Sequence, residues 1–281
     1  MNQTQRRARL GHMDFLSELL SDPATPRLTT YTTHGRMELS AQTLANWQAK
    51  VANLLTGIGA QPGDVVVLAA SASWQPAVIA LGAWKVGCAV VSSFAELTEA
   101  LRPAPSVPDA TPAPTGRLIA VFTDDADIVE SDEATDAEEI YLLSNDPFGR
   151  GVEESGGDVP FGVNDFSPEL RVQPDAFMGL DIPRATSDGL FVTQGLTAGK
   201  YLARARSQWA GEHPNAEVTA PSAATSAPRA AFSPWADTQG LAVALEPLAA
   251  GGSTVMVDTA GVSDLTKVLE SEKVTANTLE S

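Results

Sequence analysis

The segment DVVVLAA, residues 64–70, constrains the fold more than any other stretch of the chain. It is a β-branched run without polar alternation, which is typical of a strand buried on both faces of a parallel sheet. The preceding residues predict a helix that Ser40 caps and that ends near Gly57, because their apolar positions repeat at helical spacing. A second helix opens at Ser73, and CAVVSS follows as the next strand. This order predicts a βαβ unit.

The same alternation of strands and helices continues outside this unit. RLTTYTTHGRMEL predicts a β-hairpin that turns at His34-Gly35. Further strands are predicted at RLIAVF, EEIYLLS, GLFVT and STVMVD, and further helices at about 196–209, at 240–249 and in DLTKVLESE. We therefore predict an α/β fold of mainly parallel sheets with flanking helices. Trp47, Trp74 and Trp84 lie on apolar stripes and are predicted to be core residues rather than pocket residues.

Composition changes along the chain suggest its division into parts. Residues 1–12 are basic and predict a disordered arm, which leaves both Met1 and Met13 open as the true start. A first α/β lobe is predicted over 13–101 and a second over 189–281. Between them, 102–188 begins with a proline-rich linker and continues as an acidic, loop-rich insertion with short strands.

The net charge of −17 is concentrated in one region. Residues 124–188 hold 18 acidic residues against three arginines, a net charge of −15. Such a stretch argues against nucleic acid and anionic membranes as partners, because both would be repelled. Two interpretations stay open for it: a solvated loop, or a segment that binds a basic protein partner.

Few residues suggest metal or disulfide chemistry. Cys88 is the single cysteine and lies in an apolar run, which predicts a small buried side chain. The three histidines are far apart, so we predict no metal site. The N-terminus lacks the apolar region of a signal peptide, and no apolar run is long enough to span a membrane, so we expect a cytoplasmic protein.

The stretch GLFVTQGLTAGKYL, residues 189–202, has the strand, glycine-rich turn and helix order that many proteins use to hold phosphate. It departs from a P-loop, because Gln194 stands where the first glycine is needed and Tyr201 where the Mg²⁺-binding hydroxyl is needed. A different kind of phosphate loop stays open.

Several blocks in order resemble the AMP-binding, adenylate-forming enzymes, which include acyl-CoA synthetases. These blocks are GIGAQPGDVVVLAASAS, VIALGAWKVGCAVV, FSPWADTQGLAVALEPLAAGGSTVMVD and KVLESEKVT. The chain also resembles a short actinobacterial group of unknown function that is recognised by its similarity to these enzymes. The resemblance implies the N-terminal subdomains of that fold, and it is unconvincing over residues 92–188.

The resemblance implies that residues 193–200 correspond to the loop that wraps the ATP phosphates in that family. The positions that match a loop shortened by one residue, and that are candidate nucleotide-binding residues, are Thr193, Gly195, Thr197 and Lys200. Leu196 replaces a hydroxyl donor, and Ala198 replaces a glycine, which hinders close approach of the backbone. Asp237 stands where the family places a histidine, near the expected position of an anionic substrate. The family's later adenine, ribose and catalytic-lysine segments have no counterpart before Ser281.

Two functions within this family stay open, beside that of an unrelated α/β binding domain. The first is a truncated, non-catalytic relative of the AMP-dependent synthetases, a pseudoenzyme that acts as a binding or interaction protein and needs no cofactor. The second is an adenylate-forming carboxylate ligase that takes the missing half from a partner chain. In that case ATP or AMP would be the cofactor, and Thr193, Thr197 and Lys200 would hold its phosphates.

Overall fold

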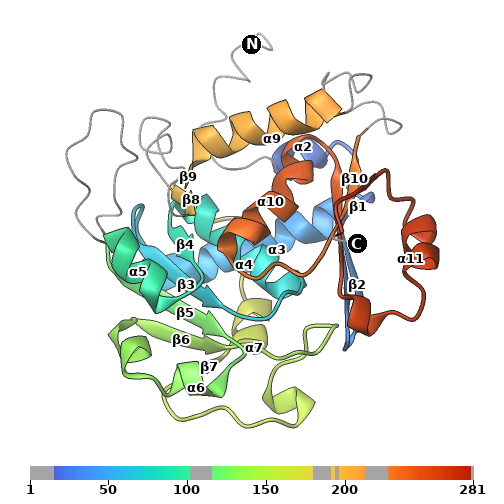
Figure 1. Cartoon of the computed structure of the whole chain (residues 1–281). Helices are drawn as coiled ribbons and strands as arrows, with labels where there is room; N and C mark the ends of the chain where they lie inside the picture. Colours follow the sequence, from blue (N-terminus) through green and yellow to red (C-terminus); the bar gives the residue numbers. More distant parts are fainter. Residues whose placement is uncertain (1–15, 102–115, 180–190, 194–195, 213–226, 280–281) are drawn as a thin grey trace.

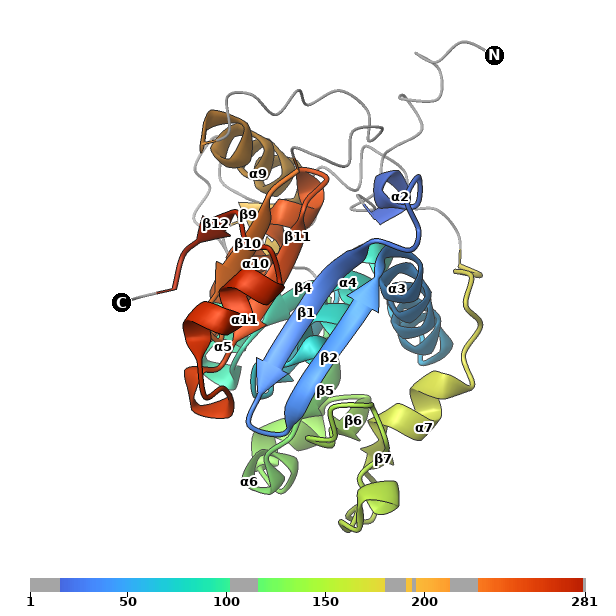
Figure 2. The same ribbon diagram turned by 90° about the vertical axis from the view of Figure 1, so that its right-hand side faces the viewer.

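The computed structural model describes residues 16–101, 116–179, 191–193, 196–212 and 227–279. These residues form two five-stranded sheets, with helices packed between the sheets and on their outer faces (Figures 1 and 2). The arrangement confirms the predicted α/β class with mainly parallel sheets and flanking helices.

Sheet A has the strand order β12-β10-β11-β1-β2. Its strands are β1 (Pro26–Thr32), β2 (Gly35–Ser40), β10 (Arg229–Phe232), β11 (Ser253–Val257) and β12 (Ala276–Asn277). β1 and β2 form the predicted hairpin, while β1 pairs in parallel with β11, for example Leu28 with Thr254. The N-terminal hairpin is therefore completed by strands from the far end of the chain.

Sheet B has the order β4-β3-β5-β6-β7, and all of its strands are parallel. Its strands are β3 (Val65–Ala69), β4 (Ala89–Val91), β5 (Leu118–Thr123), β6 (Glu139–Leu142) and β7 (Asn164–Asp165). A short antiparallel pair, β8 (Phe191–Thr193) and β9 (Leu196–Thr197), lies beside β4.

Three helices lie between the sheets (Figure 2): α3 (Ala41–Gly57), α4 (Trp74–Val86) and α10 (Thr238–Ala249). α9 (Ala198–Glu212) packs on α10, and α5 (Phe94–Leu101) and α6 (Ala126–Val129) cover the outer face of sheet B. The remaining helices are α2 (Leu16–Leu19), α7 (Phe166–Arg171) and α11 (Leu265–Ser271), with short 3₁₀ turns at Asp132–Asp136, Glu153–Ser155 and Thr259–Gly261. In the described part of the chain, no helix is long and apolar enough to cross a membrane.

Local sequence explains the central layer. The Ser40 hydroxyl accepts the N–H of Thr43 and caps α3, as predicted. A Cβ on Gly82 of α4 would lie 2.5 Å from the Val51 side chain, so glycine is what lets α3 and α4 approach this closely. Alternate residues of β3 enter different cores: Val66 faces the central helices, and Val67 faces the outer layer. The apolar DVVVLAA run is therefore buried on both faces.

Two features of the sheets were not anticipated. β10 lies within sheet A, although its sequence RAAF is alanine-rich and was not among the predicted strands. The sheets also cut across the predicted lobes, since sheet A joins residues 26–40 to residues 229–277. The division into lobes at 13–101 and 189–281 stays a prediction. The arm 1–12 and most of the proline-rich linker, 102–115, lie outside the described residues.

Candidate functional site

The residues predicted to hold phosphate are placed by β8, β9 and the first turn of α9. Thr193 ends β8 with 0% exposure, and its hydroxyl has no hydrogen-bond partner among the described residues. Thr197 ends β9, and its hydroxyl accepts the Lys200 N–H at 3.3 Å, so this side chain caps α9. The Lys200 side chain is exposed, and Gly195 lies outside the described residues.

The helix that follows is fixed to its neighbour by buried polar contacts. Tyr201 donates its hydroxyl to the Ala242 carbonyl at 3.1 Å. The Arg204 guanidinium lies 2.6 Å from the carboxylate of Glu246, which is 0% exposed. Burial raises the pKa of Glu246, and Arg204 acts in the opposite direction. These contacts hold α9, and with it Lys200, against α10.

Asp237 has a structural role in this fold. It is exposed, and its carboxylate accepts the Gly240 N–H at 2.7 Å, which makes it the N-cap of α10. The neighbouring residues Pro234 and Trp235 line a cavity, whereas Asp237 does not appear in the wall of that cavity.

Cys88, as predicted, is buried, and burial raises the pKa of its thiol.

The cavity has a volume of about 340 Å³ and lies at the carboxyl ends of strands from both sheets. Its wall is built by segments that follow β1, β3, β6, β10 and β11, and it includes Thr32–Gly35, Ser71–Trp74, Ser144–Pro147, Pro234-Trp235 and Asp258. This edge is where open α/β sheets bind ligands, and the volume is within the range of ligand pockets. Thr193, Thr197 and Lys200 are not among its described lining residues.

The loop after β6 lines the cavity and is held by polar contacts within itself. The Asp146 carboxylate accepts the backbone N–H of Phe148 at 2.9 Å and pairs with the Arg150 guanidinium at 2.8 Å. Burial alone would raise the pKa of Asp146, but the contacts with Arg150 and the backbone N–H groups hold it below its usual value. Asp146 is therefore an ionised anchor of this loop.

Two glycines let this loop close against its neighbours. Gly149 has φ +75°, and a Cβ there would lie 2.8 Å from the Trp74 ring. Gly35 has φ +142°, and a Cβ there would lie 3.2 Å from Pro147. The Trp74 indole N–H also donates to the Pro147 carbonyl at 3.1 Å. The loop thus joins the hairpin of sheet A to the first turn of α4. Sequence reasoning assigned Trp74 to the core alone, whereas it is both buried and part of the cavity wall.

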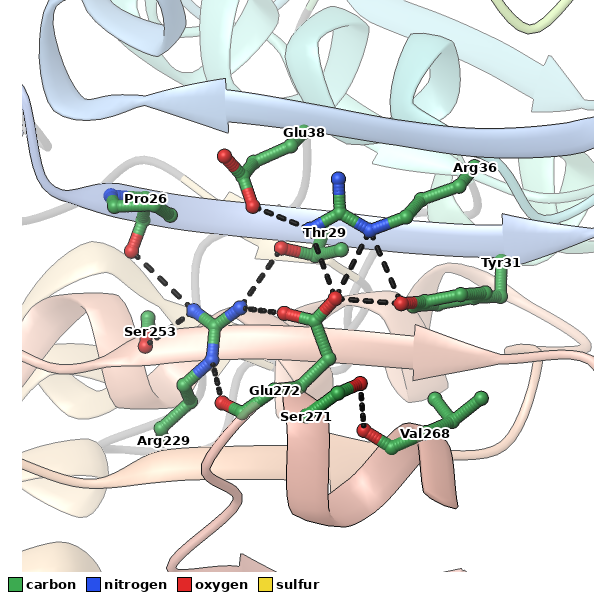
Figure 3. A network of polar contacts seen from close by, with 10 residues as sticks. All are labelled: Pro26, Thr29, Tyr31, Arg36, Glu38, Arg229, Ser253, Val268, Ser271 and Glu272. Carbon is green, nitrogen blue, oxygen red and sulfur yellow. Dashed lines mark hydrogen bonds and ion pairs between the residues drawn. The ribbon is translucent and has the colours of Figure 1, made fainter. Parts of the chain in front are cut away.

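A second polar cluster, the Glu272 cluster, consists of Tyr31, Arg36, Arg229 and Glu272 (Figure 3). The Glu272 carboxylate accepts from Tyr31 Oη at 2.6 Å, from Arg36 Nε at 2.9 Å and from an Arg229 nitrogen at 2.5 Å. Glu272 follows α11, and the other three residues belong to β1, β2 and β10. The cluster therefore attaches α11 to the outer face of sheet A.

Over the described ranges, no group of three or more His, Cys, Asp or Glu residues could hold a metal ion.

Comparison with known proteins agrees with this architecture. The family described as "AMP-binding enzyme" matches residues 22–102. An acyl-CoA synthetase from Brucella canis shares the fold with a TM-score of 0.64 at 16% identity, over 94% of this chain and 46% of that one. The anthranilate CoA ligase AuaEII, solved in complex with anthranoyl-AMP, gives 0.60 at 17% identity, over 92% of this chain and 47% of that one. The chain thus spans a little under half the length of these solved enzymes.

The matched segment and the fold together define the class: residues 22–102 match the AMP-binding enzyme family, and the chain has the fold of the N-terminal part of these synthetases. A "TIGR03089 family protein" of Mycobacterium tuberculosis is 33% identical over 261 residues, which are 92% of this chain and 93% of that relative. The chain belongs to the TIGR03089 family.

Proposed function

We propose that this protein is a non-catalytic relative of the AMP-dependent synthetases, which uses their scaffold to bind a small molecule in the cavity at the carboxyl ends of the strands. The observation that carries the proposal is that the hydroxyls of the two threonines in the expected phosphate loop are not open to solvent. The Thr197 hydroxyl caps α9, and the Thr193 hydroxyl is enclosed at 0% exposure. Neither hydroxyl is presented to a ligand in solution.

Two further features support this proposal. β8 pairs with β9 through Thr193 and Leu196, which leaves two residues between the strands. A loop of that length offers few backbone N–H groups to a triphosphate. The cavity is built from other segments, so ligand binding at this edge does not require the loop.

A ligase that forms an acyl-adenylate is the alternative, and the exposed side chain of Lys200 favours it. AuaEII was solved with anthranoyl-AMP, and MatB from Rhodopseudomonas palustris was solved with ATP bound. In this alternative, Lys200 would contact phosphate and a partner chain would supply the remaining catalytic segments. A cytoplasmic location and a basic protein partner for residues 124–188 also stay proposals.

Calorimetry with ATP·Mg²⁺ and an assay of carboxylate-dependent pyrophosphate exchange separate the two functions. We expect neither binding nor exchange. Lys200→Ala is the test variant, and Lys267→Ala is the matched control, because Lys267 is also the exposed third residue of its helix. ATP binding that Lys200→Ala removes and Lys267→Ala retains would refute the non-catalytic function and establish the phosphate contact.

A further inference from the structure

The charges around the cavity are unequal. Asp146 and Asp258 are among the residues that line it, and the Asp124 carboxylate accepts the N–H of the lining residue Ser71 at 3.2 Å. Among the described lining residues, His34 is the only one with a basic side chain. Arg150 is close by, but its guanidinium is engaged with Asp146. The wall therefore disfavours an anionic ligand and favours a neutral or cationic one.

Of the two lining aspartates, Asp258 is the one without an arginine partner among the described residues. It follows β11, where its backbone N–H donates to the Tyr31 carbonyl at 2.9 Å. One carboxylate oxygen accepts the Ala260 N–H at 2.9 Å, which fixes the side chain. The second oxygen has no hydrogen bond within the described part of the chain. Unlike Asp146, this carboxylate has no arginine partner there, so its charge is not compensated.

Aromatic groups form another part of the same wall. Trp235 follows β10, the strand beside β11, and is only 9% exposed. Its indole N–H is buried and has no hydrogen-bond partner among the described residues. Because that nitrogen is shielded from solvent, the part of Trp235 that lines the cavity is its ring and not its N–H. The Trp74 ring is also in the wall, fixed by its bond to Pro147 and packed on Trp47 with ring centroids 5.4 Å apart.

We propose that the cavity binds a small aromatic amine. The ammonium group pairs with Asp258, and the ring contacts the indoles of Trp74 and Trp235. Indole faces also attract cations, which adds to selection for a positively charged ligand. This ligand class rests on the proposed binding function. Its positive charge is opposite to that of the carboxylate that a ligase would activate.

A pair of probes with opposite charge tests the ligand class. Tyramine and 4-hydroxyphenylpropionate share a phenol ring and a short side chain, and differ in carrying an amine or a carboxylate. Calorimetry on the full chain is expected to show tyramine binding and at least about tenfold weaker binding of the carboxylate, the change expected when an attractive charge pair becomes repulsive. Equal binding of the two probes, or no binding of tyramine, would overturn the proposal.

Variants locate the amine. Asp258→Asn keeps the cap on Ala260 but removes the charge, and is expected to weaken tyramine binding about fivefold to tenfold. Asp264→Asn is the matched control, because Asp264 caps α11 in the same way and is not among the described cavity residues. Trp235→Ala removes the ring from the wall, and is expected to weaken tyramine binding severalfold. Equal effects of the two Asp→Asn variants would place the amine elsewhere.

The pyrophosphate assay keeps this test separate from that of the proposed function. Exchange activity refutes the non-catalytic function whatever tyramine does. Absence of both exchange and tyramine binding refutes the ligand class alone and leaves the non-catalytic function in place.

Discussion

Glu272 is a residue at which one substitution removes several contacts together. Its carboxylate is 7% exposed and accepts from Tyr31, Arg36 and Arg229, of which Arg229 is itself only 15% exposed. Glu272→Ala leaves a largely buried guanidinium without its partner, so we expect the free energy of unfolding to fall by about 2–4 kcal/mol. Equilibrium unfolding in urea measures this loss of stability. Glu270→Ala is the control, since Glu270 is exposed on α11 just before Glu272, and we expect a change within about 0.5 kcal/mol.

The same contacts give this effect a pH dependence. Burial alone would raise the pKa of Glu272, but hydrogen bonds from Tyr31, Arg229 and Arg36 lower it below its ordinary value of 4.5. The folded pKa is then below the unfolded one, so the stabilisation is complete above about pH 4.5 and is lost as pH falls through the folded pKa. The stability difference between wild type and Glu272→Gln is expected to shrink as pH falls through this range. A difference that is the same at pH 7 and pH 3 would contradict this role.

At the scale of single elements, the loop 144–150 depends on Gly149. Gly149→Ala places a Cβ at a positive φ and against the Trp74 ring, whereas Gly156→Ala meets a similar φ of +86° in open space. We expect Gly156→Ala to cost about 1 kcal/mol, for backbone strain alone. Gly149→Ala is expected to cost about 1–2 kcal/mol more, because the loop must also move away from Trp74. Chemical denaturation of both variants checks this, and equal losses would show that the loop is not held against Trp74.

The elements that sequence predicted are those determined by neighbouring residues, and the ones it missed are determined by contacts between distant segments. The Ser40 cap, the apolar stripe of α3 and the β-branched β3 are local signals, and the structure confirms each of them. β10 was missed because Ala230 and Ala231 have weak strand preference; they form a strand because β11 and β12 pair with them and bury them. The cavity was missed for a related reason. Its wall comes from segments far apart in sequence, and no motif marks Asp258 or the second role of Trp74.

At the scale of the whole molecule, the two sheets share one core. Leu28 of sheet A and Phe122 of sheet B are both fully buried in one continuous apolar cluster, with α3, α4 and α10 between them. β1 also pairs with β11, so residues from both ends of the chain are needed to complete sheet A. A core that is shared in this way is expected to unfold as one cooperative unit.

Equilibrium unfolding tests this expectation against the division into lobes at 13–101 and 189–281. We expect one transition in urea, with the same midpoint by tryptophan fluorescence and far-ultraviolet circular dichroism. Leu28→Ala, which removes a fully buried side chain from β1, is expected to lower the free energy of unfolding by about 2–5 kcal/mol and to shift both signals together. Two resolved transitions, of which Leu28→Ala moves only one, would instead mean that the lobes are independent and that the interface between the sheets contributes little to folding.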